Sequence, residues 1–197
     1  MIPLPVELSD DEEWDRTGRR VLWALPTPLV VVGSREGDRV NLMTANWVMQ
    51  VATAPRLVVL SVETTSLTCQ LIRGSGRFSV SLLARDDRAL VRKFVKPATE
   101  VTRQSTGALQ SIQGVEVHET QTGLPVLDAA VAWMACRVLD ADALEVAFAA
   151  LAASGQGASE ATSHALVVGQ VVEVEDRRLG QDVDVLSMGD TRMNYGG

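Results

Sequence analysis

Short runs of apolar and β-branched residues, bounded by turn-forming residues, recur along the chain from residue 29 onward and predict β-strands. A hairpin is predicted from Leu29–Val32 to Val40–Met43, because the segment Ser34–Asp38 between them is rich in turn-forming residues. Further strands are predicted at Leu57–Val62, Arg77–Leu82, Val131–Leu139 and His164–Glu175.

The polar residues within these runs predict how each strand is covered. Leu57–Val62 is almost continuously apolar, which is typical of a strand covered on both faces. Apolar and polar residues alternate strictly over Arg77–Leu82, so this strand is expected to bury only one face. Gly169 lies in the middle of the last run, where a barrel strand often bends or bulges.

Few segments show a helical pattern. A capping box at Ser9 opens a predicted helix over about residues 9–24, which Pro26 ends. Shorter helices are predicted at Ser66–Arg73 with Gly74 after it, at Asp86–Val95 with Asp86 as N-cap, and at Ala141–Ala153. Six or more strands without regular strand–helix alternation predict a closed or nearly closed antiparallel barrel.

Length and charge narrow the class of protein. The 197 residues are expected to form one domain, residues 26–197, after a helical extension, residues 1–25. With 18 basic and 25 acidic residues the net charge is −7, which argues against nucleic acid or an anionic membrane as a partner.

Two cysteines and two histidines are too few for a disulfide framework or a multi-histidine metal site, so no metal is expected. Without an apolar leader or an apolar run of about 18 residues, the protein is expected in the cytoplasm.

Two polar stretches are the main candidates for chemistry, because the glycine-rich nucleotide loops and the serine elbow of hydrolases are absent from the sequence. Thr44–Trp47 follows a predicted strand. Glu63–Thr68 carries four hydroxyls at a strand-to-helix junction. Hydroxyls and free backbone N–H groups at such a junction favour an anion such as phosphate, although an N-cap with surface threonines is the plainer interpretation.

Several landmarks follow one another in a characteristic order. They are Met43–Asn46, the proline in ATAPRLVVLSV, the hydroxyl cluster, and the stretches IRGSGRFSVSLL, GLPVLDAAVAWMACRV and HALVVGQVVEVE. From about residue 20 onward this order resembles the flavin reductase-like, FMN-binding split-barrel family. The resemblance implies a mainly β fold, a six-stranded antiparallel split barrel of Greek-key type with a few flanking helices. It also implies a homodimer with one flavin per subunit in a groove near the dimer interface.

The resemblance also implies roles for particular residues. The residues implied to bind the cofactor are Thr44, Ala45, Asn46 and Trp47 at the ring, Thr65, Ser66 and Thr68 at the phosphate, and in addition Ser81, Arg192 and Tyr195. His164 is implied to lie near the reactive edge of the flavin and is the catalytic candidate. From the residues alone, Trp47 as a core residue, His164 as a surface residue, and the 141–163 insert as a lid or an extra surface helix all stay open.

The function expected from the resemblance is reduction of FMN, or of FAD, by NADH or NADPH, with a monooxygenase as the partner that receives reduced flavin. Two alternatives stay open: a flavin-binding electron carrier or storage protein, and a split-barrel relative with another cofactor. The lack of an arginine in the hydroxyl cluster keeps the last alternative open. The other candidate cations for a phosphate are Arg73, Lys93 and Lys96.

Overall fold

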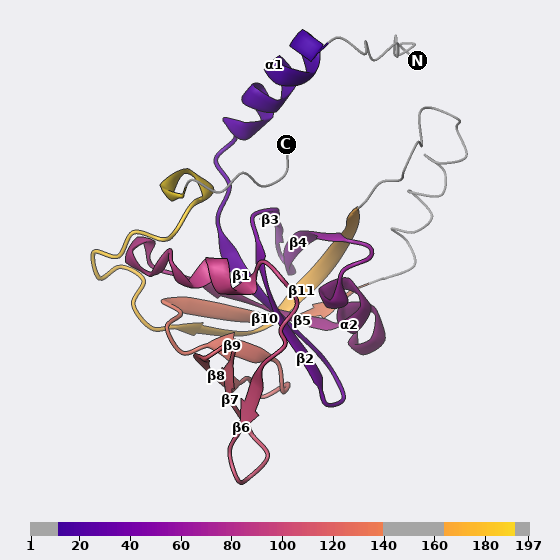
Figure 1. Ribbon diagram of the computed structural model, residues 1–197, viewed down its shortest axis with the longest axis vertical. Coiled ribbons are helices and arrows are strands. Elements are labelled where there is room, and N and C mark those ends of the chain that lie inside the picture. The colour runs from indigo at the N-terminus through magenta and orange to yellow at the C-terminus, as the bar shows by residue number, and fades with distance from the viewer. Residues whose placement is uncertain (1–11, 140–163, 192–197) are drawn as a thin grey trace.

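The computed structural model describes residues 12–139 and 164–191, and two antiparallel sheets form its framework (Figure 1). The strands are β1 (Val30–Glu36), β2 (Arg39–Ala45), β3 (Val48–Thr53), β4 (Arg56–Glu63), β5 (Arg77–Leu82), β6 (Val101–Arg103), β7 (Leu109–Ile112), β8 (Val115–Glu119), β9 (Pro125–Leu127), β10 (Ala132–Val138) and β11 (His164–Asp176). The helices are α1 (Glu12–Trp23), α2 (Leu67–Ser75) and the short 3₁₀ helices η1 (Arg85–Asp87), η2 (Leu90–Phe94) and η3 (Met188–Asp190). The predicted mainly β, antiparallel architecture is confirmed.

The larger sheet closes on itself through a two-residue link. Its strand order is β2-β1-β5-β10-β11-β4-β3, so β2 and β3 lie at opposite edges. These strands are nevertheless consecutive in the chain, and only Asn46 and Trp47 separate them. Because the three steps from Ala45 to Val48 span at most about 11 Å, the sheet must curl until its edges meet at this end. We call the gap between these two edges the split.

This sheet has seven strands where six were expected. The additional strand is β3, which pairs with β4. The sequence pattern misses it because Met49, Gln50 and Val51 are all exposed, so no apolar–polar alternation marks a buried face. The smaller sheet has the order β6-β7-β8-β9.

Two predictions of strand burial are wrong. The serines of β5, Ser79 and Ser81, are buried although they alternate with apolar residues. Ser79 Oγ donates to the carbonyl oxygen of Pro125 at 2.6 Å, and Ser81 Oγ accepts from the backbone N–H of Leu127 at 3.2 Å. Both partners belong to β9 of the smaller sheet, which therefore covers this face of β5. In β4, by contrast, only alternate residues are buried.

Two apolar clusters occupy the two faces of the larger sheet. The first contains Leu60 and Phe78 of the sheet and Ile72 of α2. The second packs Val31 of β1 against Phe94 of η2 and against residues of the smaller sheet. Helix η2 is thereby held against the β2 side of the split.

Gly169 has a packing role, and the bulge of β11 lies elsewhere. The register between β10 and β11 shifts so that Val172 is the extra residue. At Gly169 the backbone passes close to Phe78, and a Cβ atom there would lie 2.6 Å from the ring.

The predicted helix ends need correction. Ser66 is the N-cap of α2, as its position suggested, but Gly74 lies inside the helix. Gly76 ends α2 instead, because it adopts a left-handed conformation with φ of 66°. The predicted helix Asp86–Val95 is replaced by η1 and η2, and no side chain caps either of them.

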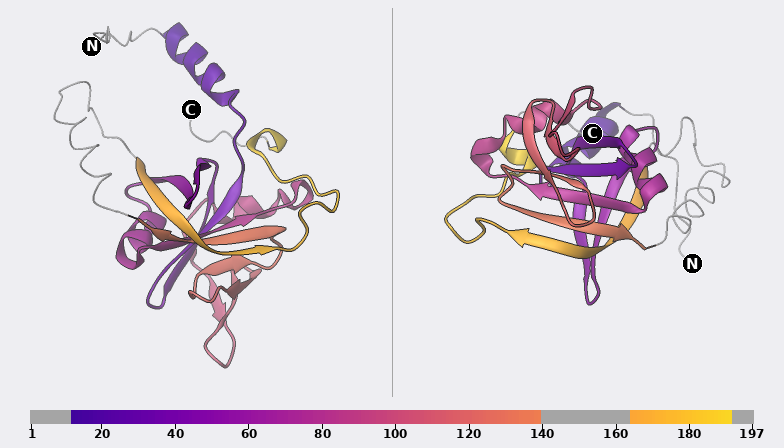
Figure 2. Two further views of the ribbon diagram at one scale, coloured as in Figure 1. Left: turned by 180° about the vertical axis from the view of Figure 1, so that it is seen from behind. Right: turned by 90° about the horizontal axis from the view of Figure 1, so that it is seen from below.

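Helix α1 stands clear of the sheets in two views of the molecule (Figures 1 and 2). It covers residues 12–23 of the predicted helix over 9–24. Ser9 and the predicted helix Ala141–Ala153 lie outside the described residues. Among the helices of the described residues, none has the length and apolar character needed to cross a membrane.

Candidate functional site

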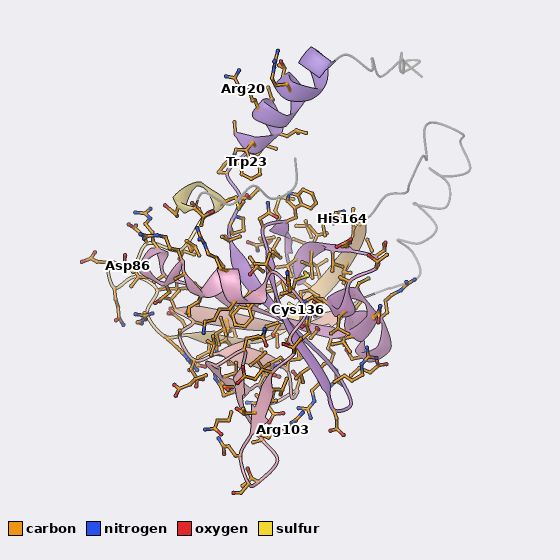
Figure 3. The ribbon with its side chains drawn as sticks, in the orientation of Figure 1. Arg20, Trp23, Asp86, Arg103, Cys136 and His164 are labelled. Carbon is orange, nitrogen blue, oxygen red and sulfur yellow. The ribbon has the colours of Figure 1, made fainter. Side chains whose placement is uncertain are left out.

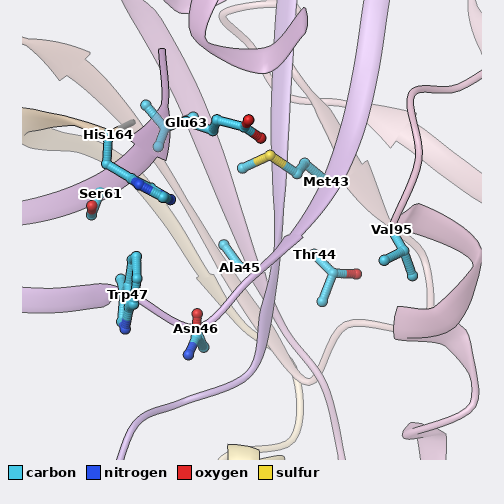
Figure 4. A pocket seen from close by; sticks show the side chains of 10 residues that line it. Met43, Thr44, Ala45, Asn46, Trp47, Ser61, Glu63, Val95 and His164 are labelled. Atoms are coloured by element: carbon cyan, nitrogen blue, oxygen red, sulfur yellow. The ribbon is translucent and has the colours of Figure 1, made fainter. Parts of the chain in front are cut away.

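A hollow of about 360 Å³ opens at the split, where ends of β2, β4 and β11 come together (Figure 4). We call it the split hollow. Its lining residues are Met43, Thr44, Ala45, Asn46, Trp47, Ser61, Val62, Glu63, Val95 and His164. The fold therefore brings the first polar stretch and His164 together, and the volume is in the range of small-molecule sites.

The open edge of β2 adds main-chain groups to this hollow. The β1–β2 hairpin closes with the pair Glu36–Arg39 around a two-residue turn. In an antiparallel ladder, residues alternate between bonding to the neighbouring strand and directing their N–H and C=O away from it. Counted from the closing pair, Ala45 bonds to β1, whereas the N–H and C=O of Thr44 face the open edge. The split hollow thus has a backbone donor and a backbone acceptor on its β2 side.

Trp47 and His164 form the rim. Their ring centroids lie 4.9 Å apart with an interplanar angle of 67°, an edge-to-face contact. The backbone N–H of Ser61 donates to the carbonyl oxygen of Trp47 at 2.9 Å, which ties this rim to β4. Trp47 is 38% exposed, so it is a rim residue and not a core residue. Figure 3 shows His164 at the periphery of the molecule.

Glu63 supplies a carboxylate beside His164. The two residues are directly opposed in the β4–β11 ladder, and both line the split hollow. Thr65 Oγ1 donates to Glu63 Oε1 at 3.1 Å. Among the described residues that line the hollow, Glu63 and His164 are the only ionisable ones, and Glu63 is the only acidic one.

The hydroxyl residues of the second polar stretch lie next to the split hollow without lining it. As N-cap of α2, Ser66 Oγ accepts a backbone N–H at 3.1 Å and also donates to the carbonyl oxygen of Glu63 at 2.7 Å. Thr68 is fully buried, and its Oγ1 accepts from Asn41 Nδ2 at 2.9 Å. Thr65 donates to the Glu63 carboxylate. All three hydroxyls have partners within the protein, and the nearest charge among these partners is negative.

The other predicted cofactor residues are dispersed. Ser81 is buried against β9 and does not reach the split hollow. The hydroxyl of Thr44 donates to the carbonyl oxygen of Val91, which leaves its backbone as the group available to a ligand. Arg192 and Tyr195 lie outside the described residues, so their roles stay predictions.

The candidate cations are not part of the lining either. Lys93 Nζ donates to the carbonyl oxygen of Gln113 at 3.3 Å, and Arg73 and Lys96 are exposed elsewhere. Sequence reasoning missed Glu63 and Val95. The position of Glu63 at the start of the hydroxyl stretch could have marked it as a candidate. Only the pairing of β4 with β11 shows that it lies opposite His164.

The thiols lie apart from the site. Cys69 and Cys136 are free and buried. Burial raises the pKa of the Cys136 thiol to about 12, and it also raises the pKa of Cys69. Both therefore stay protonated at neutral pH and are poor nucleophiles.

Comparison with known proteins places the chain in a family. It matches the flavin reductase like domain over residues 22–194, and it belongs to that family. Its fold is similar to the NADH:FAD oxidoreductase of Streptomyces globisporus C-1027, with a TM-score of 0.66, 21% identity, and 98% of each chain covered. It is also similar to the styrene monooxygenase flavin reductase of Pseudomonas putida S12, with a TM-score of 0.58, 22% identity, and coverage of 80% of this chain and 86% of that one.

Curated relatives match shorter stretches. The high molecular weight rubredoxin of Moorella thermoacetica is 27% identical over 109 residues, which cover 55% of this chain and 44% of that protein. The chain spans less than half the length of the curated relatives it matches.

Proposed function

We propose that the protein is an oxidoreductase that reduces FMN or FAD with NADH or NADPH. One observation carries the proposal. In a chain of the flavin reductase like family, the split hollow combines apolar surface, main-chain groups on the open edge of β2 and the edge-to-face pair of Trp47 and His164.

The residues of the split hollow suit a flavin ring better than a phosphate. A flat tricyclic ring requires apolar surface along its faces and hydrogen-bond partners at its polar edge. Met43, Ala45 and Val95 supply apolar surface, and the backbone of Thr44 supplies a donor and an acceptor. The carboxylate of Glu63 would repel a phosphate placed in the same hollow.

A bound flavin supplies the hydride-transfer chemistry, and the residues of the chain bind and orient it. Trp47 covers one side of the rim and limits the access of water, while the open side of the hollow leaves space for a nicotinamide. Hydride transfer depends on close stacking more than on a general acid or base. His164, opposite Glu63, is therefore proposed to hold a hydrogen bond at the rim and to fix the orientation of the reacting rings.

We further propose that the protein forms a homodimer and passes reduced flavin to a monooxygenase. Met49 and Val51 expose apolar surface on β3 beside the split, and Val21, Leu22 and Leu25 do so at the end of α1. Exposed apolar patches of this kind mark interaction surfaces. The proposal of a monooxygenase partner is supported by the similarity to the styrene monooxygenase reductase.

Nicotinamide oxidation tests the proposed function. Purified protein is mixed with NADH or NADPH and with FMN or FAD, and the loss of reduced-nicotinamide absorbance is followed. Turnover is expected with at least one combination, and His164→Ala is expected to lower kcat by about 10- to 100-fold while flavin affinity changes less.

His118→Gln is the matched control, because His118 is the only other histidine of the chain and lies outside the split hollow. It is expected to retain turnover. Absence of nicotinamide oxidation with all four combinations would overturn the proposed activity.

The similarity to a high molecular weight rubredoxin favours a second candidate, a flavin-binding electron carrier. Such a protein would be purified with flavin bound and would not oxidise either nicotinamide. The visible spectrum of the purified protein, taken together with the turnover assay, separates the two candidates.

A further inference from the structure

A second hollow, of about 490 Å³, borders the 3₁₀ helix η2, whose C-cap residue Val95 lines the split hollow. Its lining residues are Arg88, Ala89, Arg92, Asp190 and Thr191. We call it the cationic hollow. Its two guanidinium groups contrast with the acidic lining of the split hollow.

The charges of Arg88 and Arg92 are not neutralised by carboxylates. Within the described residues no ion pair joins either side chain to an acidic residue, whereas Arg85, Arg177 and Arg178 are all paired. The two arginines line the same hollow, so their like charges repel each other there. In a chain of net charge −7, two uncompensated cations at one hollow favour an anionic ligand.

Asp190, the one carboxylate among the described residues that line the cationic hollow, already has hydrogen-bond partners. Asp190 Oδ1 accepts from Arg85 Nε at 2.8 Å, and Asp190 Oδ2 accepts from the Ser187 hydroxyl at 2.7 Å. Hydrogen bonds from Ser187 and the nearby Arg85 hold the pKa of Asp190 below its ordinary value. Because its two oxygens are bound by Arg85 and Ser187, Asp190 does not neutralise the charges of Arg88 and Arg92.

Helix geometry connects the two hollows. Residues 89–95 keep helical backbone angles from Ala89 to Val95. In a 3₁₀ helix the side chains at i and i+3 eclipse, so Ala89, Arg92 and Val95 form one line. Val95 lines the split hollow, and Ala89 and Arg92 line the cationic hollow. With a rise of about 2 Å per residue, Arg92 lies about 6 Å along the axis from Val95.

Helix η2 is also fixed in place. Val91 and Phe94 form a second line of the helix, which is buried, and the carbonyl oxygen of Val91 accepts a hydrogen bond from the hydroxyl of Thr44. The line of Ala89, Arg92 and Val95 is therefore held on the β2 side of the split, with Val95 at one hollow and Arg92 at the other.

We propose that the cationic hollow binds the phosphate of the flavin nucleotide whose ring occupies the split hollow, with Arg88 and Arg92 as the phosphate ligands. This inference rests on the proposed function. It assigns the phosphate to a different place from the hydroxyl stretch, where Ser66 and Thr68 already have protein partners and Glu63 is negative.

Paired flavin titrations test the site. FMN and riboflavin share the ring, and only FMN carries the phosphate, so their dissociation constants separate the two hollows. For the double variant Arg88→Gln/Arg92→Gln, the dissociation constant of FMN is expected to rise about 10- to 100-fold, and that of riboflavin to stay within about twofold. Arg56→Gln is the matched control, because Arg56 is an exposed arginine at the start of β4 and lines neither hollow.

Three results would overturn the assignment: an unchanged affinity of the double variant for FMN, an equal loss of affinity for FMN and riboflavin, or an effect confined to the KM for NADH. Failure of the proposed function is distinguishable from these results. In that case the unmodified protein binds neither FMN nor riboflavin, whereas a misplaced phosphate site leaves riboflavin binding intact.

Discussion

At the scale of single residues, the packing around Gly169 leaves no room for a side chain. A Cβ atom at this position would lie 2.6 Å and 2.7 Å from two ring carbons of Phe78 and 2.9 Å from the Cβ of Cys136. Phe78 is fully buried, so its ring has no free space to move into. Gly169→Ala is therefore expected to lower the free energy of unfolding by about 1–3 kcal/mol, measured by urea unfolding.

Gly189→Ala is the control for this substitution, because the nearest atom to its new Cβ would be Ser187 Oγ at 3.7 Å, an ordinary contact. It is expected to change the free energy of unfolding by less than about 0.5 kcal/mol. Equal losses in the two variants would contradict the packing argument.

At the scale of the element, the hydroxyl of Ser66 is assigned to the start of α2. Its Oγ accepts a first-turn backbone N–H, so Ser66→Ala is expected to lower the free energy of unfolding by about 1 kcal/mol. Thr65→Ala is the control, since the exposed Thr65 hydroxyl bonds only to the side chain of Glu63. Thermal unfolding measures both variants. If Ser66→Ala instead weakened FMN binding and spared riboflavin, the phosphate would belong at this junction and not at Arg88 and Arg92.

Local chemistry allowed several elements to be predicted from the sequence. The first hairpin, the N-cap Ser66 and the polar stretch Thr44–Trp47 each depend on neighbouring residues only. Contacts between residues far apart in the sequence could not be predicted in this way. Ser79 is buried because β9 of another sheet accepts its hydroxyl, and Glu63 faces His164 only because β4 pairs with a strand far along the chain.

At the scale of the whole molecule, closure of the larger sheet creates the site. The Asn46–Trp47 link joins the two sheet edges, and the split hollow lies where their backbone groups cannot complete a ladder. The same closure places η2 beside the hollow, since the hydroxyl of Thr44 on β2 bonds to Val91 on η2. The homodimer proposed above also belongs to this scale, and it can be tested by experiment.

Helix α1 is the element through which the proposed homodimer can be tested. It has 12 residues, and no other element of the described chain packs closely against it. A helix of this length is marginal alone in water. Leu22 in its last turn is 64% exposed, and Leu25 just after it is 60% exposed, so we expect this apolar surface to pack against a partner. We expect that partner to be a second copy of the chain.

The variant Leu22→Glu/Leu25→Glu is expected to raise the dimer dissociation constant at least about tenfold, because each leucine buried at an interface contributes about 1.5–3 kcal/mol. Sedimentation equilibrium measures this constant, and Arg20→Ala, on the same helix, is the control that is expected to keep it. In a monomeric fold these leucines already face water, so the thermal stability of the fold should change little. An unmodified protein that stays monomeric at every concentration, or a double variant that dimerises as well as the control, would refute a role of α1 in pairing two subunits.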